Sequence, residues 1–242
     1  MSGVTLFVSD LHLAAERPRI VASFAEFLHV EACRAEALYI LGDLFEYWIG
    51  DDQPTPGLES VLAGFESLKT AGVPCHFQHG NRDFLLGANF AERFGWRLLP
   101  EATVIDLYGV PTLLLHGDTL CTDDLEYQKL RRMLRDPTWQ QQFLAWPLAE
   151  RLAQALALRE RSMNATRGKA EVIMDVNAEA VASTLARAGV THLIHGHTHR
   201  PGTHAWTDAN GQSFRRTVLG DWYEQGSVLR VTAEGQTLTL LS

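Results

Sequence analysis

Short runs of apolar residues recur along the chain, and a polar cluster follows each of them directly. The runs occupy residues 5–8, 38–41, 75–78, 113–115 and 193–194. Apolar runs that end in turn-forming residues are typical of strands that are buried on both faces. We therefore predict five buried strands, each of which leads into a polar loop.

Between these runs the apolar positions follow a helical spacing. The helical pattern covers residues 20–35, 58–71, 89–94 and 177–188. Gly72 and Gly189 follow two of these stretches, at the place where a helix commonly ends in a left-handed glycine. From residue 203 onward apolar and polar residues alternate, which predicts an antiparallel sheet. Together the patterns predict an α/β architecture with layered sheets.

Residues 125–161 have a different character, since leucine and aromatic residues recur there at helical spacing with arginines between them. Residues 125–170 carry nine Lys or Arg against four Asp or Glu, although the whole chain has a formal charge of −8. We predict a basic helical cap at 125–170, inserted into a core formed by 1–124 and 171–242. The apolar faces of this cap suit either an acyl-chain groove or packing against the core.

Length and composition narrow the possible classes of protein. A chain of 242 residues of which 46% are hydrophobic can bury a full core. It begins without the features of a signal peptide, and no apolar stretch approaches the roughly 20 residues of a membrane span. The negative charge argues against nucleic acid as a partner, and Cys33, Cys75 and Cys121 form no CxxC pair. We expect a cytoplasmic globular protein with reduced thiols.

Five polar clusters follow the predicted strands and contain residue types that bind metal ions. They are Asp10-Leu11-His12, Gly42-Asp43, Gly80-Asn81-Arg82-Asp83, His116-Gly117-Asp118 and Gly196-His197-Thr198-His199. Loops at the carboxyl ends of parallel strands converge on one crevice, so these clusters can meet in space. Residues two apart point the same way in extended backbone, and we expect this of Asp10 with His12 and of His197 with His199.

The clusters offer seven candidate metal ligands. They are Asp10, His12, Asp43, Asn81, His116, His197 and His199. This mixture of oxygen and imidazole donors is too large for one tetrahedral zinc ion and suits two metal ions that share a carboxylate and a water. Such a pair would make hydroxide available at neutral pH. The spacing leaves Mn, Fe and Zn open, and each cluster alone is also typical of an ordinary turn.

The order of the clusters resembles the motifs of the calcineurin-like metallophosphoesterases, which run D-x-H, G-D, G-N-x-D/E, H and G-H-x-H. This resemblance implies a sandwich of two mixed β-sheets flanked by helices, with an inserted helical cap. It also implies that Asp43 bridges two metal ions. The other ligands would be Asp10, His12 and His199 for the first ion, and Asn81, His116 and His197 for the second.

Longer strings around the same clusters, at residues 40–46, 79–87 and 116–124, resemble a narrower family, the UDP-2,3-diacylglucosamine hydrolases of lipid A biosynthesis. In that family water attacks the α-phosphate of a UDP-linked diacylated glucosamine and releases UMP and lipid X. The resemblance implies two Mn²⁺ ions per chain and a lipid-linked UDP-sugar as substrate. It also implies a peripheral position on the inner face of the bacterial inner membrane. We expect a monomer.

The same resemblance implies which residues act on the substrate. The catalytic set would be Asp43, Asn81, Arg82 and His116. The substrate contacts would be Asn81, Arg82, Asp124, Ser162, Thr166, Lys169 and His197. Thr166 departs from the asparagine that is typical of its position, although a hydroxyl can still donate a hydrogen bond. Tyr127 and Arg159 are further candidates.

Arg82 stands where many phosphomonoesterases with this metal core carry histidine. Arginine cannot act as a general acid at neutral pH, but it can stabilise anionic oxygen. A phosphate leaving group is a far weaker base than an alkoxide and needs no proton donor. Arg82 therefore favours a phosphoanhydride substrate, although a cation on a surface turn would look the same in the sequence.

Two other functions fit part of the pattern. A soluble nucleotide or pyrophosphate phosphoesterase of the same fold would share the metal ligands but gives no reason for an apolar cap. A non-catalytic scaffold built on a decayed phosphoesterase fold would be expected to lose ligands, whereas all seven are present.

Overall fold

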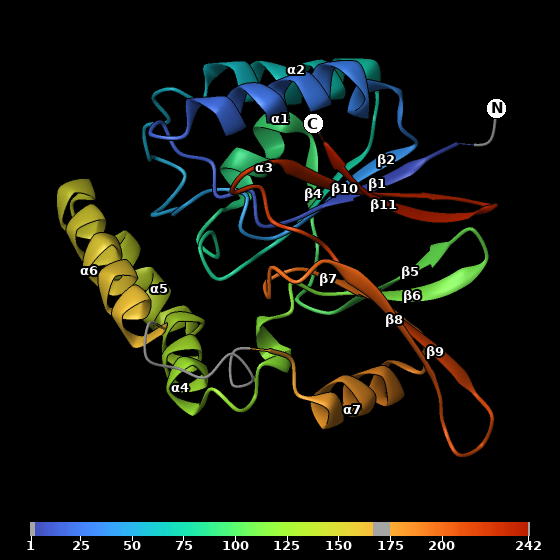
Figure 1. The fold of residues 1–242 in the computed structure, drawn as a ribbon. Coiled ribbons are helices and arrows are strands. Elements are labelled where there is room, and N and C mark those ends of the chain that lie inside the picture. The colour runs from blue at the N-terminus through green and yellow to red at the C-terminus, as the bar shows by residue number, and fades with distance from the viewer. Residues whose placement is uncertain (1–2, 167–174, 242) are drawn as a thin grey trace.

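Two β-sheets packed face to face form the body of the protein (Figure 1). The computed structural model describes residues 3–166 and 175–241, and the side chains of 3–161 and 175–241. The first sheet has the strand order β11-β10-β1-β2-β3-β4, and the second has the order β5-β6-β7-β9-β8.

The strands are short and fall into two sets. The first sheet contains β1 (Thr5–Val8), β2 (Ala37–Leu41), β3 (Cys75–Gln78), β4 (Trp96–Leu98), β10 (Gly226–Thr232) and β11 (Gly235–Leu241). The second contains β5 (Thr103–Leu107), β6 (Val110–Leu114), β7 (His192–His195), β8 (Gly202–Thr207) and β9 (Ser213–Val218). The five strands predicted from apolar runs correspond to β1, β2, β3, β6 and β7.

Both sheets are mixed. Strands β1 to β4 are parallel, and β10 and β11 extend this sheet in antiparallel pairing. In the second sheet β6, β7 and β9 are parallel, while β5 and β8 pair antiparallel at its two edges. The predicted α/β sandwich of two mixed sheets is confirmed.

The prediction of one antiparallel sheet for the C-terminal tail is wrong. Strands β8 and β9 join the second sheet, where β9 is parallel to β7, whereas β10 and β11 join the first. Alternation at period two identifies strands but does not say which neighbour each one pairs with.

Helices flank the sandwich. Their bounds are α1 (Pro18–Val30), α2 (Glu59–Ala71), α3 (Ala88–Phe94), α4 (Leu125–Leu134), α5 (Pro137–Leu144), α6 (Leu148–Thr166) and α7 (Ala178–Ala188). Figure 1 shows α1 and α2 over the first sheet and α7 beside the second. Gly72 and Gly189 end α2 and α7 with φ of 73° and 67°, which confirms the predicted left-handed caps. Helix α1 ends earlier than predicted, and a 3₁₀ turn at Ala32–Arg34 follows it.

Apolar residues of both sheets pack together in the middle of the sandwich. Phe7, Leu41, Leu114, Ile194 and Leu229 come from five strands and belong to one buried cluster. Burying a side chain of this kind contributes roughly 1.5–3 kcal/mol. This shared core fixes the two sheets against each other, so that loops from both sheets can contribute to one site.

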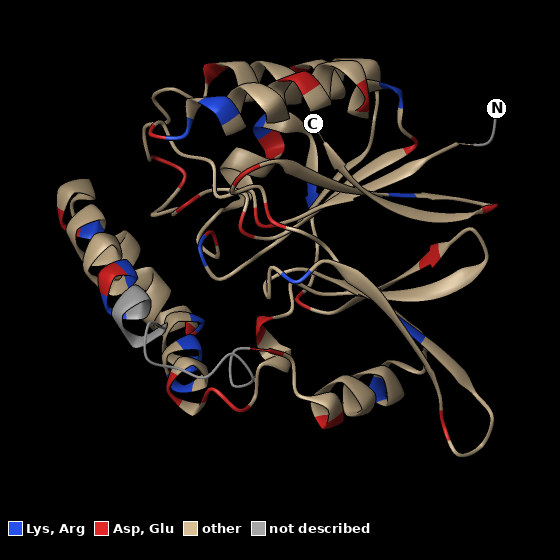
Figure 2. Cartoon of the chain, viewed as in Figure 1, with Lys and Arg blue, Asp and Glu red and all other residues tan. Residues whose placement is uncertain are grey.

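Helices α4, α5 and α6 stand beside the sandwich as a separate group (Figure 1). Arg151 of α6 is only 4% exposed, donates to the carbonyl of Ile49 and forms an ion pair with Asp52 at 2.8 Å. Basic residues recur along α4 and α6 (Figure 2). Within the described ranges, no helix has the length and apolar character needed to cross a membrane.

Candidate metal centre

The loops after β1 and β2 are tied together by backbone hydrogen bonds that continue the parallel pairing of these strands. The amide of Asp10 donates to the carbonyl of Gly42 at 3.1 Å, and the amide of His12 donates to the carbonyl of Asp43 at 2.9 Å. This pairing carries the Asp-x-His and Gly-Asp clusters side by side beyond the edge of the sheet.

The backbone of the candidate ligands is left-handed at five of the seven positions. The φ angles are 55° at Asp10, 49° at His12, 53° at Asp43, 70° at His197 and 53° at His199. A non-glycine residue in this conformation costs about 1–3 kcal/mol and commonly marks a functional site. The expectation that Asp10, His12, His197 and His199 lie in extended backbone is therefore wrong, because tight turns aim these side chains instead.

Two groups of candidate ligands share Asp10. The ligand atoms of Asp10, His12 and His199 lie within 4.8 Å of one another, and so do those of Asp10, Asp43 and His116. Asp43 presents its two oxygens in different directions, with Oδ2 lying 3.9 Å from Nε2 of His12 and Oδ1 lying 3.7 Å from Nε2 of His116. A carboxylate in this position can bridge two cations.

Asn81 joins two more histidines to the cluster. Its Oδ1 lies 3.0 Å from Nε2 of His116 and 2.8 Å from Nδ1 of His197. The structure thus brings together all seven candidate ligands, with His12 and His199 on one side and Asn81, His116 and His197 on the other. His197 and His199 therefore face different parts of the cluster.

Other groups orient the imidazole rings. His116 contacts the carbonyl of Leu41 through Nδ1 at 2.8 Å, which leaves Nε2 directed at the cluster. Nδ1 of His199 lies 3.6 Å from Asp221, and Nδ1 of His12 lies 3.7 Å from Glu46. Partners of this kind on the far ring nitrogen are typical of metal-binding histidines.

Three buried polar atoms of the cluster make no hydrogen bond to any described residue. They are Oδ1 of Asp10 and both ring nitrogens of His12. Buried polar groups are almost always paired, and leaving one unpaired costs about 1–3 kcal/mol. A cation coordinated by Oδ1 of Asp10 and Nε2 of His12 would satisfy these two atoms, while Nδ1 of His12 faces Glu46 at 3.7 Å, so the residues fit the metal ions that the donor set implies.

Burial also shifts the pKa values of the cluster. It raises the pKa of Asp43 to about 7 and lowers the pKa of His12 to about 3 and of His197 to about 4. Burial opposes ionisation of Asp10 as well, but the contact with Nε2 of His199, 3.4 Å from Oδ1, and the charges of nearby histidines hold its pKa below the usual range. Neutral imidazoles are the form that binds metal ions.

Small residues and one buried acid allow the loops to approach closely. A Cβ atom on Gly80 would lie 2.1 Å from Oδ1 of Asp43, so only glycine fits there. The carboxylate of Asp83 accepts hydrogen bonds from the amides of Gly80 at 2.9 Å and Leu44 at 2.7 Å. Asp83, the last residue of the Gly-Asn-x-Asp cluster, thus has a structural role: its hydrogen bonds hold the loops after β2 and β3 together.

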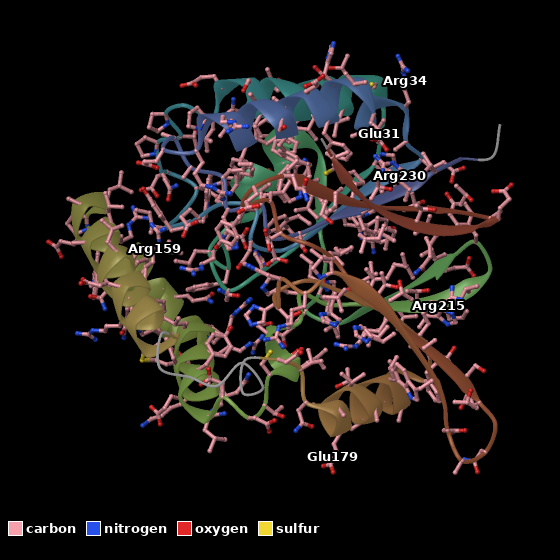
Figure 3. The ribbon with its side chains drawn as sticks, in the orientation of Figure 1. Glu31, Arg34, Arg159, Glu179, Arg215 and Arg230 are labelled. Carbon is pink, nitrogen blue, oxygen red and sulfur yellow. The ribbon has the colours of Figure 1, made fainter. Side chains whose placement is uncertain are left out.

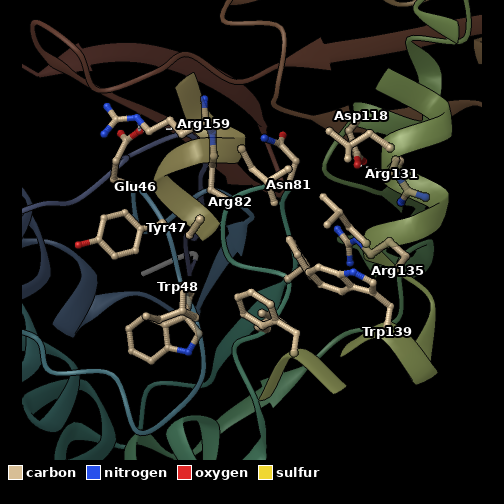
Figure 4. A pocket seen from close by; sticks show the side chains of 18 of the residues that line it. Glu46, Tyr47, Trp48, Asn81, Arg82, Asp118, Arg131, Arg135, Trp139 and Arg159 are labelled. Carbon is tan, nitrogen blue, oxygen red and sulfur yellow. Dashed lines mark hydrogen bonds and ion pairs between the residues drawn. The ribbon is translucent and has the colours of Figure 1, made fainter. Parts of the chain in front are cut away.

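A cleft opens beside Asn81 and Arg82 and extends under helices α4 to α6 (Figure 4). Its empty volume is about 830 Å³. Near the cluster its wall is polar, with Glu46, Asp118 and Arg131; further away it is apolar, with Trp48, Ile49, Phe84, Leu85, Leu130, Leu134, Trp139, Phe143, Ala155 and Leu158. A concave and largely apolar site that begins at a few polar groups suits an amphipathic ligand.

The predicted substrate contacts are placed unevenly. Asn81 and Arg82 line the cleft, and Arg82 also donates its amide to Oδ1 of Asp43 at 2.8 Å. Asp124 caps helix α4 by accepting a hydrogen bond from the amide of Tyr127 at 3.1 Å. The side chains of Ser162 and Thr166, and the whole of Lys169, lie outside the described residues.

Tyr127 and Arg159, named above as further candidates, both line the cleft. The hydroxyl of Tyr127 donates to Asp118 at 3.0 Å, and its ring centroid lies 5.8 Å from that of His197. Nε of Arg159 lies 2.9 Å from the carboxylate of Glu46 (Figure 4).

Sequence reasoning assigned no role to Glu46, Asp118 or Asp221, although all three contact the site. Glu46 and Asp118 are almost fully buried acids, and buried acids are rare unless they are paired. Glu46 and Asp118 do lie within or next to the clusters in the chain, which is a usable signal. Asp221 lies more than twenty residues beyond the last cluster, and nothing in the sequence singles it out.

The sequence matches known proteins over nearly its whole length. Residues 4–201 match the family model described as calcineurin-like phosphoesterase. The chain is 53% identical to "UDP-2,3-diacylglucosamine hydrolase" of Stenotrophomonas maltophilia over 98% of both chains. It is 52% identical to the protein of that name from Edwardsiella ictaluri, over 96% of this chain and 89% of that one. It is 51% identical to the protein of that name from Xanthomonas campestris, over 98% of this chain and 99% of that one. The chain therefore belongs to the calcineurin-like phosphoesterase family.

Proposed function

We propose that the chain hydrolyses the pyrophosphate bond of UDP-2,3-diacylglucosamine in lipid A biosynthesis. Water attacks the α-phosphate, and the products are UMP and 2,3-diacylglucosamine 1-phosphate, which is lipid X. One observation carries this proposal: Asn81, which contacts His116 and His197 of the ligand cluster, also lines a cleft with an apolar far wall. The full-length relatives that bear this activity in their names support it.

The metal ions of this reaction are two Mn²⁺. By the family pattern, Asp10, His12, Asp43 and His199 would hold one ion, and Asp43, Asn81, His116 and His197 would hold the other; the contacts among these residues support this division. Mn²⁺ accepts carboxylate, amide and imidazole ligands together. When bound, such a pair supplies a deprotonated water at neutral pH and stabilises charge on the phosphoryl oxygens.

Arg82 stabilises the leaving phosphate. Its amide is anchored on Asp43, which places the side chain at the mouth of the cleft beside the ligand cluster. The guanidinium is permanently charged and donates hydrogen bonds to anionic oxygen without transferring a proton. A sugar phosphate leaves without protonation, so a cation is sufficient at this position.

The apolar part of the cleft takes the acyl chains. The rings of Trp139 and Phe143 stack with centroids 4.9 Å apart, and Trp48 and Ile49 of the core also line the cleft. Burial of hydrocarbon contributes about 0.8 kcal/mol per CH₂ group. A soluble nucleotide would leave this wall unused, which disfavours the alternative of a soluble pyrophosphate phosphoesterase.

The remaining contacts follow from the family pattern. Asp124, Ser162, Thr166 and Lys169 join Asn81, Arg82 and His197 around the sugar and phosphates, and 125–170 acts as the substrate-binding cap. Leu125, Met133 and Leu144 are exposed on helices α4 and α5, and Trp146 is exposed between α5 and α6. Helix α4 also carries the exposed Arg132. An apolar and basic surface suits peripheral contact with anionic lipid on the inner face of the inner membrane. The chain acts there as a monomer.

The test is UMP release from UDP-2,3-diacylglucosamine by metal-stripped protein, with and without added Mn²⁺. UDP-N-acetylglucosamine, which lacks the acyl chains, is the matched substrate. We expect Mn²⁺-dependent cleavage of the acylated substrate alone. Equal cleavage of both substrates would overturn the lipid assignment and leave the metal centre standing.

A further inference from the structure

Thr198 of the Gly196-His197-Thr198-His199 loop lines a second pocket. It has an empty volume of about 620 Å³, and its wall includes Asp175, Thr198, Arg200, His204 and Arg216. We call it the polar pocket. Thr198 stands between two candidate metal ligands in the chain, so the loop that carries these ligands also contributes to the polar pocket.

The two cavities differ in polarity, and so do the acyl chains and the nucleoside of the proposed substrate. The cleft under α4 to α6 is largely apolar, whereas the polar pocket has two guanidinium groups, a carboxylate, an imidazole and hydroxyls in its wall. We propose that the polar pocket binds the nucleoside of the UDP group, which places the scissile pyrophosphate between the two cavities. This inference rests on the proposed function.

Arg216 is the main candidate for contact with the base. It projects from β9, is half-buried, and its Nη1 lies 3.4 Å from Nε2 of His195. A guanidinium carries five N–H donors, so this contact leaves donors for a ligand. The guanidinium plane can also stack on a base, and its donors match carbonyl oxygens such as those of uracil.

Two further groups fit the ribose. The carboxylate of Asp175 is held by Nη1 of Arg200 at 2.8 Å and by the amide of Val176 at 2.7 Å. Carboxylates in this fixed state are common acceptors for ribose hydroxyls. Oγ1 of Thr198 is buried and makes no hydrogen bond to the part of the chain that the structure describes. A buried hydroxyl of this kind indicates a missing partner.

The experiment is calorimetric titration of the Mn²⁺-loaded full chain with UMP, ribose 5-phosphate and 2′,3′-dideoxy-UMP. We expect UMP to bind about tenfold more tightly than ribose 5-phosphate, the value of one hydrogen bond to a charged group. Arg216→Gln should remove this advantage and leave ribose 5-phosphate unaffected. Asp175→Asn should weaken UMP and leave 2′,3′-dideoxy-UMP unchanged.

The matched control is Arg215→Gln. Arg215 precedes Arg216 on β9, is exposed, and projects from the opposite face of the strand (Figure 3). The same loss of charge there should leave UMP affinity unchanged. Thermal unfolding of all variants identifies any loss of folding, and Asp175→Asn keeps the test open if Arg216→Gln does not fold.

The outcomes separate this inference from the proposed function. If the chain hydrolyses the lipid substrate but neither Arg216→Gln nor Asp175→Asn changes UMP affinity, the polar pocket does not bind the nucleoside. The proposed function would remain intact. Absence of lipid-substrate hydrolysis, with UMP binding that still depends on Arg216, would overturn the proposed function and support a nucleotide site.

Discussion

Nε of Arg159 lies 2.9 Å from the carboxylate of Glu46, and the other oxygen of that carboxylate lies 3.7 Å from Nδ1 of His12. Glu46 follows β2, whereas Arg159 projects from α6 towards the sandwich (Figure 3). One buried acid thus contacts both a candidate metal ligand and a helix that forms the wall of the cleft. The arrangement couples the position of α6 to the geometry of the metal centre.

Replacing Glu46 tests this coupling. Glu46→Gln keeps the size of the side chain but removes the charge that orients His12 and holds Arg159. We expect Mn²⁺ affinity to fall about 10–100-fold, the usual effect of losing a partner of a metal-binding histidine. The measurement is activity of metal-stripped protein against added Mn²⁺.

Glu31→Gln is the control for that variant, because it removes an acid that pairs with Arg230 at 2.6 Å far from the cleft (Figure 3). It should leave the Mn²⁺ dependence unchanged. If Glu46→Gln behaves in the same way, Glu46 has no role in orienting His12.

Asp43→Ala removes the carboxylate that lies between the two groups of ligands. We expect turnover to be nearly abolished, with metal analysis showing fewer than two Mn²⁺ bound per chain. Glu179→Ala, which removes an exposed acid at the start of α7, should retain full activity (Figure 3). Wild-type turnover by Asp43→Ala would contradict the assignment of two metal ions to this site.

Arg82→His offers a proton donor in place of a permanent cation. We expect kcat/KM for UDP-2,3-diacylglucosamine to fall about 10²-fold, the scale of losing one electrostatic contact to a developing anion. Arg82→Lys should retain more activity, since it keeps the charge. Faster turnover of the lipid substrate by Arg82→His would contradict the leaving-group argument.

Arg151→Met tests how α6 is held on the core. The change removes a buried guanidinium that contacts Asp52 and the carbonyls of Ile49 and Trp146. We expect the free energy of unfolding to fall by about 2–3 kcal/mol, the scale of hydrogen bonds to a charged group. Urea unfolding measures this, and Arg132→Met, at an exposed position of α4, is the control. Equal stability of the two variants would show that Arg151 does not hold the helix.

Thiol reactivity tests the expectation that the cysteines are reduced thiols. Burial raises the pKa of Cys121 to about 12 and raises that of Cys75 as well, so both remain uncharged thiols at pH 8. The thiolate is the reactive form. We expect one rapidly modified thiol per folded chain, at the half-buried Cys33, and three in denaturant. Rapid modification of Cys121 in the folded chain would show that its loop opens readily.

Much of the fold and of the ligand set could be predicted from local patterns. Apolar runs marked β1, β2, β3, β6 and β7, because a strand buried on both faces must be apolar along its length. The clusters that follow these strands lie at the same edge because parallel strands end there together. Residue type and order therefore identified the seven candidate metal ligands.

Only the tertiary structure decided how these side chains are aimed and what surrounds them. The left-handed backbone at Asp10 and His12 is imposed by hydrogen bonds to the loop after β2, which no local pattern reports. The division of the tail between two sheets depends on packing between distant strands. Asp221 and Arg159 contact the site across long stretches of chain, and such contacts are set by how the sheets and helices pack together rather than by their own sequence neighbours.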